Sequence, residues 1–266
     1  MKIRAIAINT FREGVRQPVF YILIALGAVL LPLSAYFTLF SFGEEARLVK
    51  DMGLATIALF GLLIALFTSS SVIADEIDKK TVLTVLCKPV SRVEFVLGKF
   101  LGIVTAAAVA MLILAAVLCF ATFLATRVDL HVNAHPSGHA FAHVPSILVG
   151  TLFAFLQVFV IAAVSVAVST RFPMIVNVSV CLSLYVLGHV TRYLFINTDR
   201  SSLAGYLGAA AYALVPNLGN FNVAGAIALG QPIPTGYILL AVLYALACAS
   251  VALLLALASF QTREVM

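Results

Sequence analysis

The sequence predicts an all-α integral membrane protein with six transmembrane helices, and three observations support that prediction. Hydrophobic residues make up 63% of the 266 residues and charged residues 10%, whereas soluble domains contain about 45–50% and 25%. The mean hydropathy is +1.13. Several nearly uncharged windows of about 20 residues are each long enough to cross a hydrocarbon layer about 30 Å thick. The predicted spans are 18–41, 53–74, 98–126, 147–170, 173–196 and 237–260.

The first 17 residues are expected to form an amphipathic interfacial helix before the first span. On a helical wheel, one side carries Lys2, Asn9, Arg12, Glu13 and Arg16. The other side carries Ile3, Ile6, Ala7, Ile8, Phe11 and Val15. Such a helix lies along the membrane surface until Pro18 turns the chain into the bilayer. The alternative is a basic leader that only sets the orientation of the first span.

The distribution of Lys and Arg predicts the orientation. With the N-terminus inside, only five of the 16 Lys and Arg residues fall outside: Arg47, Lys50, Arg127, Arg192 and Arg200. The positive-inside rule therefore places both termini and residues 75–97 in the cytoplasm, and 127–146 and 197–236 outside. No basic cluster is interleaved with aromatic residues, so a nucleic-acid partner is not expected.

The segment "DEIDKKTVLTVLCKPVSRVEFVLGK", residues 75–99, carries frequent charges between two apolar spans. Its apolar residues recur at helical spacing, which predicts a short helix over about 78–87. That helix has an apolar stripe and a polar face with Lys79, Lys80 and Thr84; the stripe comprises Leu83, Leu86, Cys87 and Val90. Pro89 disfavours helical geometry at Lys88 and so ends the helix.

A second helix is predicted to begin at Ser91, where "SRVE" has the spacing of a capping box between Ser91 and Glu94. Val90 and Phe95 occupy the staple positions around this cap. The helix has no breaker before about residue 126, so it is roughly 50 Å long and its first turns stand in the cytoplasm. An ordered corner of this kind favours docking of a soluble partner. The alternative is a short helix that rests on the membrane surface.

The residues "E…KKTVLTVLCKPVSRVEFVLGK" resemble the segment after the second transmembrane helix of ABC-2 type permeases. The N-terminal helix, the six spans and the Pro-Asn-containing segment before the last span resemble the branch associated with copper-enzyme maturation. This resemblance implies one ABC-2 transmembrane domain over 1–266, in a bacterial-type cytoplasmic membrane. It also implies an exporter that works as a homodimer or heterodimer and is driven by a separate ATPase, which binds ATP and Mg²⁺. The implied coupling residues are Lys79, Lys80, Leu83, Leu86, Pro89, Val90, Ser91, Arg92 and Glu94.

Other functions find less support in the residues. Gly98-Lys99 lacks the upstream glycine of a P-loop, so ATP hydrolysis is expected in another polypeptide. No acidic residue falls inside a predicted span, which argues against an ion-coupled carrier or an aspartyl protease. His189 and Arg192 are expected to cap or snorkel at the outer interface rather than to catalyse. The four scattered cysteines are expected to be small packing residues.

The outer loop contains "HVNAHPSGHAFAH", with His131, His135, His139 and His143 four residues apart. Neutral imidazoles are good ligands for copper or zinc, but Pro136 and Gly138 interrupt a continuous helix. The alternative is a polar loop in which the histidines have no shared role. A metal site would favour a second function, a membrane assembly factor for an extracytoplasmic metalloenzyme with a periplasmic protein as partner.

The remaining outer segment, 197–236, is apolar but rich in Gly and Asn, with Pro216. It is expected to form short or re-entrant helices rather than a seventh span, since irregular backbone at membrane depth must be covered by protein or water. Membrane lipid surrounds the spans. Interfaces made of Ala, Val and Leu are compatible with transport of lipids or peptides, or with purely mechanical work.

Overall fold

The computed structural model describes residues 2–37, 45–74, 91–133, 144–195 and 216–261, and every regular element in these ranges is helical. The elements are α1 (Lys2–Arg16), α2 (Pro18–Phe37), α3 (Glu45–Ser69), the π-helix η2 (Ser70–Ala74), α6 (Arg92–Asn133), α7 (Val144–Ser169), α8 (Met174–Phe195), the 3-10 helix η4 (Leu218–Phe221), α10 (Ala224–Ala228) and α11 (Thr235–Gln261). The all-α class is therefore confirmed for the part of the chain that the structure describes.

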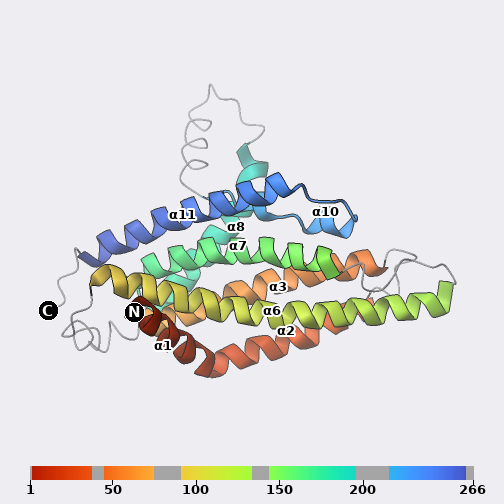
Figure 1. Cartoon of the computed structure of the whole chain (residues 1–266), viewed down its shortest axis with the longest axis horizontal. Helices are drawn as coiled ribbons and strands as arrows, with labels where there is room; N and C mark the ends of the chain where they lie inside the picture. The colour runs from red at the N-terminus through yellow and green to blue at the C-terminus, as the bar shows by residue number, and fades with distance from the viewer. Residues whose placement is uncertain (1, 38–44, 75–90, 134–143, 196–215, 262–266) are drawn as a thin grey trace.

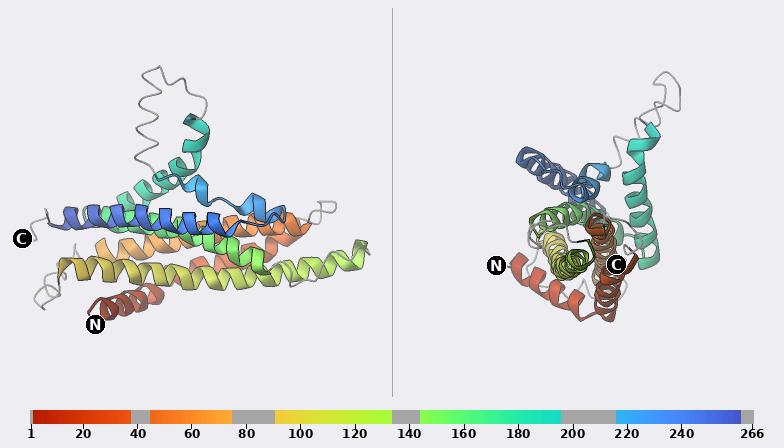
Figure 2. Two further views of the ribbon diagram at one scale, coloured as in Figure 1. Left: turned by 45° about the horizontal axis from the view of Figure 1, so that its top comes forward. Right: turned by 90° about the vertical axis from the view of Figure 1, so that its right-hand side faces the viewer.

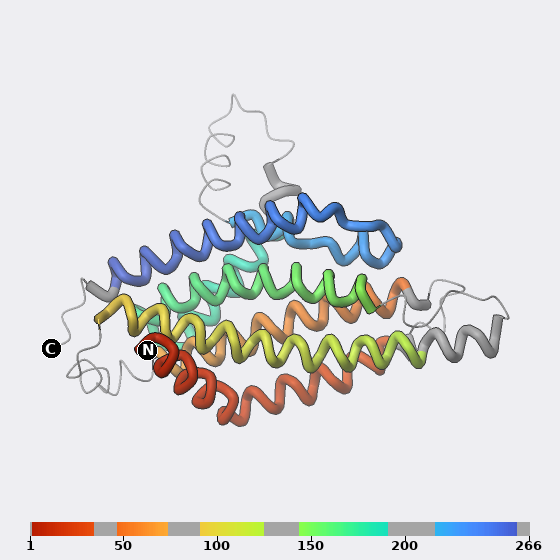
Figure 3. The backbone as a smooth tube through the Cα atoms, viewed as in Figure 1, coloured from red at the N-terminus to blue at the C-terminus, as the bar shows by residue number. Residues whose placement is uncertain are grey.

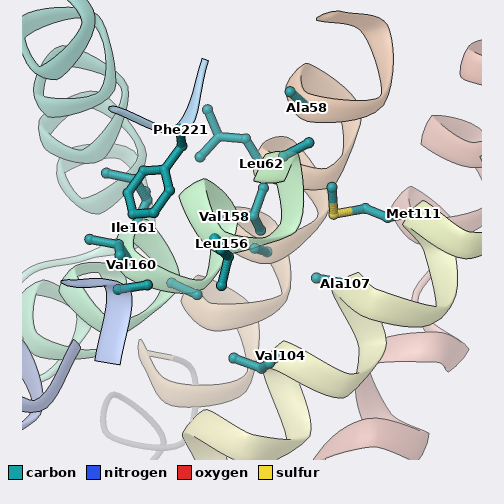
Figure 4. Close-up of a cluster of buried hydrophobic side chains, with 14 of the residues drawn as sticks. Ala58, Leu62, Val104, Ala107, Met111, Leu156, Val158, Val160, Ile161 and Phe221 are labelled. Atoms are coloured by element: carbon teal, nitrogen blue, oxygen red, sulfur yellow. The ribbon is translucent and has the colours of Figure 1, made fainter. Parts of the chain in front are cut away.

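The long helices run side by side as an elongated bundle (Figure 1). α3, α6 and α7 form its centre, and α2 and α11 flank them. The core between the three central helices is made of aliphatic side chains, with Leu62 of α3, Met111 of α6 and Val158 of α7 facing one another (Figure 4). Phe221 of η4 closes this core from the side. α8 diverges from the bundle axis (Figure 2).

Two ends of the bundle can be distinguished. α1 and the start of α6 lie at the end where α11 finishes, which we call the proximal end (Figure 1). α3, α7 and α11 begin at the opposite, distal end, where α10 also lies.

The chain bends sharply between α1 and α2 (Figure 3). The two helix axes differ in direction by 64°. Pro18 is the first residue of α2, a position where its missing N–H costs no helical hydrogen bond. The predicted turn at Pro18 is confirmed.

Among the residues that the structure describes, four helices are long and apolar enough to cross a membrane: Arg47–Ile73, Arg92–Leu124, Val144–Ser169 and Thr235–Ser259. The bent pair of α1 and α2 would add a fifth span if it is counted as one. The apolar part of α8, Met174–Val190, is shorter. The chain therefore has four or five membrane-capable helices in its described ranges, and six spans remain a prediction.

Two boundaries extend the sequence prediction. α3 begins at Glu45, before the predicted span, so Lys50 and Asp51 belong to the same helix as the span. α6 continues to Asn133 and is about 63 Å long, because no Gly or Pro interrupts residues 126–133. η4 and α10 are two short helices before α11, in agreement with the short helices expected there.

Candidate functional site

The start of α6 carries the predicted capping box. The backbone N–H of Ser91 donates to Glu94 Oε2 at 2.9 Å, and the backbone N–H of Glu94 donates to Ser91 Oγ at 3.2 Å. The hydrogen bond from the Ser91 backbone lowers the pKa of Glu94, and nearby Lys2 lowers it further. A carboxylate at this position also complements the positive end of the helix dipole. The capped corner, defined here as Ser91–Glu94, is thus an ordered helix start, and the predicted cap is confirmed.

Directly after the corner, α1 lies against α6 at two glycines. A Cβ atom on Gly98 would lie 2.7 Å from Ile6 Cβ, and one on Gly102 would lie 2.4 Å from Thr10 Cβ. Both distances are shorter than real side-chain contacts, so only glycine permits this approach. The spacing is that of a G-x-x-x-G motif, which brings helix backbones close together. α1 is therefore fixed to the first turns of α6.

A buried cation lies at this contact. Lys99 of α6 is 3% exposed, and its Nζ lies 3.7 Å from Oε2 of Glu13 on α1. Nζ also lies 5.6 Å from the centre of the Phe95 ring. A charge removed from water requires partners of this kind. The ion pair therefore makes the packing of α1 on α6 specific as well as close.

The expected faces of the N-terminal helix hold in part. Phe11 and Val15 of the apolar side pack against a buried hydrophobic cluster. Two residues depart from the wheel: Glu13 of the polar side pairs with Lys99 of α6, and Ile8 of the apolar side is 42% exposed. The buried residues of α1 are instead Thr10 and Gly14, because α1 packs on another helix through small residues, which hydrophobicity does not reveal.

Where α3 passes into η2, three consecutive serines bond to three different parts of the bundle. Ser69 Oγ lies 3.2 Å from Ser169 Oγ of α7, and Ser70 Oγ accepts from Asn177 Nδ2 of α8 at 2.7 Å. Ser71 Oγ accepts from the side chain of Gln17, at the bend between α1 and α2.

Asn177 is the centre of this polar cluster. It is fully buried, and its Nδ2 also donates to Ser165 Oγ at 2.9 Å, while Cys181 Sγ donates to its Oδ1 at 3.4 Å. Hydrogen bonds between membrane helices contribute about 0.6 kcal/mol each on average, and π-helical turns are frequent at functional sites. The cluster fixes the last turn before residues 75–90, just as the capped corner fixes the first turn after them.

The structure describes only part of the predicted site. Ser91, Arg92 and Glu94 lie at the start of α6. The other predicted coupling residues, Lys79, Lys80, Leu83, Leu86, Pro89 and Val90, lie outside the described residues. Sequence reasoning missed Glu13, Lys99 and Asn177. The G-x-x-x-G spacing and a lone Asn within a predicted span were the signals that could have indicated these contacts.

The predicted metal residues also fall largely outside the described ranges. His131 belongs to the last turn of α6, and His135, His139 and His143 lie in the undescribed segment. Within the described residues, no group of three or more His, Cys, Asp or Glu side chains could hold a metal ion. The metal hypothesis therefore stays a prediction.

The described residues line at least two cavities at the distal end, beside α10. One, of about 340 Å³, lies against α3, α7 and α8, and its wall includes Asp51, Gln157, Tyr185 and His189. His189 is not simply a surface residue, because its Nδ1 lies 3.0 Å from the Tyr185 carbonyl oxygen and the two rings are 4.5 Å apart. The second cavity, of about 370 Å³, has Lys50 in its wall.

Together the apolar bundle, the docked N-terminal helix and the capped corner define a helical integral membrane protein with an ordered proximal end. The chain belongs to the ABC-2 transporter family: the profile described as "ABC-2 family transporter protein" matches residues 15–183, more than half of the chain. The resemblance drawn from residues 75–99 is thus confirmed, and the chain is a permease subunit of an ABC transporter. Membership implies an ABC ATPase as partner. No curated protein matches the chain.

Proposed function

We propose that this permease works as an exporter in a bacterial-type cytoplasmic membrane, and that a separate ATPase docks on residues 79–95. In this proposal two permease subunits, identical or different, pair in the membrane. The proximal end is cytoplasmic, which agrees with the excess of Lys and Arg there. ATP and Mg²⁺ bind to the partner and not to this chain.

The observation that carries the proposal is the rigid attachment on both sides of residues 75–90. On one side the polar cluster joins η2 to α7, α8 and the α1–α2 bend. On the other side the capped corner leads without interruption into α6, a core helix of 42 residues. A force applied between two such anchors moves the membrane helices, whereas a flexible loop would absorb it.

Substitution of Leu86 tests the proposal. Leu86→Asp would place a charge in an apolar contact, at a cost of several kcal/mol unless the contact is released. We expect the variant to insert normally in the membrane but to lose ATPase co-purification and transport. Thr84→Asp, on the polar face of the same predicted helix, is the control and should keep both. A Leu86→Asp protein that retains its ATPase and full transport would refute the docking role.

A milder change probes the cap itself. Ser91→Ala removes one capping hydrogen bond, at a cost of about 1 kcal/mol. The membrane domain should stay folded while ATP hydrolysis and transport become partly uncoupled. The assembly-factor alternative predicts instead that neither variant affects function and that loss of His131, His135, His139 and His143 does.

A further inference from the structure

Lys50 is a buried cation at the distal end of the bundle. It lies in the second turn of α3 and is only 6% exposed. By sequence it is one of the five Lys and Arg residues on the side of the membrane that the positive-inside rule disfavours. A lysine at a membrane interface would ordinarily extend its ammonium into water, so its burial calls for a specific explanation.

None of the residues that the structure describes forms a hydrogen bond or ion pair with Lys50. The neighbouring carboxylate, Asp51, lies in the wall of the other distal cavity. Lys50 Nζ is not among the fully enclosed polar atoms without a hydrogen-bond partner in the described residues, so it keeps access to the cavity that Lys50 lines. Lysines that are mostly buried are nearly always paired with an anion, and the described part of the chain supplies none.

The cavity beside Lys50 is suited to supply that partner. Its volume of about 370 Å³ falls within the range of small-ligand sites, about 300–1,000 Å³. Pro145, Ser146 and Val149 of α7 form one wall; Ile227 and the segment 230–233 form another. No acidic residue is among the described residues that line it.

The groups in these walls favour a negative charge. α7 is a helix of 26 residues that begins at Val144, so the cavity lies at its N-terminal turn. Backbone N–H groups at a helix start have no partner inside the helix and carry partial positive charge, which makes such a terminus an anion site. The Gln231 side-chain amide is a further hydrogen-bond donor in the wall. With Lys50 and the start of α7, it forms a set of donors around one cavity.

We propose that this cavity binds a phosphate group, with Lys50 as its counter-ion and the first turn of α7 as its hydrogen-bond donor. Lys50 is the fourth residue of the apolar helix that begins at Arg47, which puts the cavity at the border of the hydrocarbon layer. Phospholipid phosphates lie at that depth in either leaflet, so the inference does not depend on orientation. It is also independent of the ATPase, of transport and of the metal hypothesis.

Binding can be measured on the full-length permease alone. The protein is reconstituted into nanodiscs that contain phosphatidylglycerol. The lipids that stay bound when the protein is released from the nanodisc are counted by native mass spectrometry. Parallel nanodiscs contain a galactosyl diacylglycerol with the same acyl chains but no phosphate. Inorganic phosphate is titrated into the detergent-purified protein by calorimetry, which separates a lipid phosphate from a free one.

We expect one tightly held phosphatidylglycerol, and at least tenfold weaker retention in Lys50→Gln. Arg47→Gln, which removes a cation one turn earlier on the same helix and outside the cavity wall, should stay within twofold of the unchanged protein. Lys50→Arg keeps the charge and should stay within about threefold, which guards against a general folding defect in Lys50→Gln. A different result would also support the site. If the unchanged protein binds inorganic phosphate rather than the lipid, and Lys50→Gln loses that binding, the site belongs to a free anion.

Three results would overturn the proposal. The first is equal retention of phosphatidylglycerol by the unchanged protein and by Lys50→Gln, with no heat from inorganic phosphate. The second is retention of the galactolipid as tight as that of the phospholipid. The third is a Lys50→Arg protein that binds no better than Lys50→Gln.

Discussion

The contact between α1 and α6 makes a sharp prediction for Gly102. Gly102→Ala would place a Cβ atom 2.4 Å from Thr10 Cβ and 2.7 Å from the Ala7 carbonyl oxygen. The second atom belongs to the backbone, so rotation of a side chain cannot relieve the contact. α1 must therefore move away from α6.

The magnitude follows from the cost of the overpacked contact, which is about 1–3 kcal/mol. The higher helix propensity of Ala does not offset it, because α6 stays helical whether α1 is docked or not. We expect the contact to be weakened by about 1–3 kcal/mol, which raises the population of the open state about 5- to 150-fold. Gly236→Ala in α11 is the matched control, because its new Cβ would meet no atom within 4 Å.

The opening can be measured at Thr10, which is fully buried and whose hydroxyl has no hydrogen-bond partner among the described residues. In a variant without the four native cysteines, Thr10→Cys provides a single thiol at the contact. Its maleimide labelling should accelerate about 5- to 150-fold with Gly102→Ala and stay unchanged with Gly236→Ala. An unchanged rate with Gly102→Ala, or an equal rise with Gly236→Ala, would refute the requirement for glycine.

Three further predictions concern the pH, the topology and the outer loop. The cap lowers the pKa of Glu94 from its ordinary 4.5. The stabilisation that the ionised Glu94 gives to the cap is therefore complete above pH 4.5 and is lost as the pH falls through the lowered pKa. Amide exchange at Glu94 should report this loss, and Glu94→Gln should abolish the acid step. A label at residue 80 should react only from the cytoplasm and one at residue 137 only from outside; labelling of 137 from the cytoplasm would overturn the six-span topology. A peptide of residues 131–143 should bind Cu²⁺ or Zn²⁺ weakly and release it near a pKa of about 6.5; no heat above buffer at neutral pH would dismiss the metal site.

Local features of this fold could be predicted from the sequence. The cap between Ser91 and Glu94 depends on residues three apart, and the turn at Pro18 depends on the chemistry of one residue. The break between α7 and α8 coincides with Pro173, and the predicted spans 147–170 and 173–196 agree with Val144–Ser169 and Met174–Phe195 to within a few residues. These signals depend only on residues close together in the sequence, so they do not change with the tertiary contacts of the helices.

Contacts between distant segments could not be predicted in the same way. The partner of Glu13 is Lys99, and the partners of Asn177 include Ser70 and Ser165. In a sequence where almost every span is uniformly apolar, hydrophobic periodicity carries little information about which face meets which helix. The amphipathic pattern of α1 predicted that it lies along a membrane surface. The glycine spacing on α6 determines which helix α1 packs against.

The π-helical turn at Ser70–Ala74 has a consequence for how this chain can vary in length. Ser69, Ser70 and Ser71 each reach a different neighbour, and the π-helical turn holds one residue more than an α-helical turn would. Deletion of one of these serines would allow α3 to continue as a regular helix. Because an α-helix turns by about 100° per residue, a serine moved by one position would point away from its present partner. The surplus residue thus works as a phase adjuster, which keeps the three serine contacts in register.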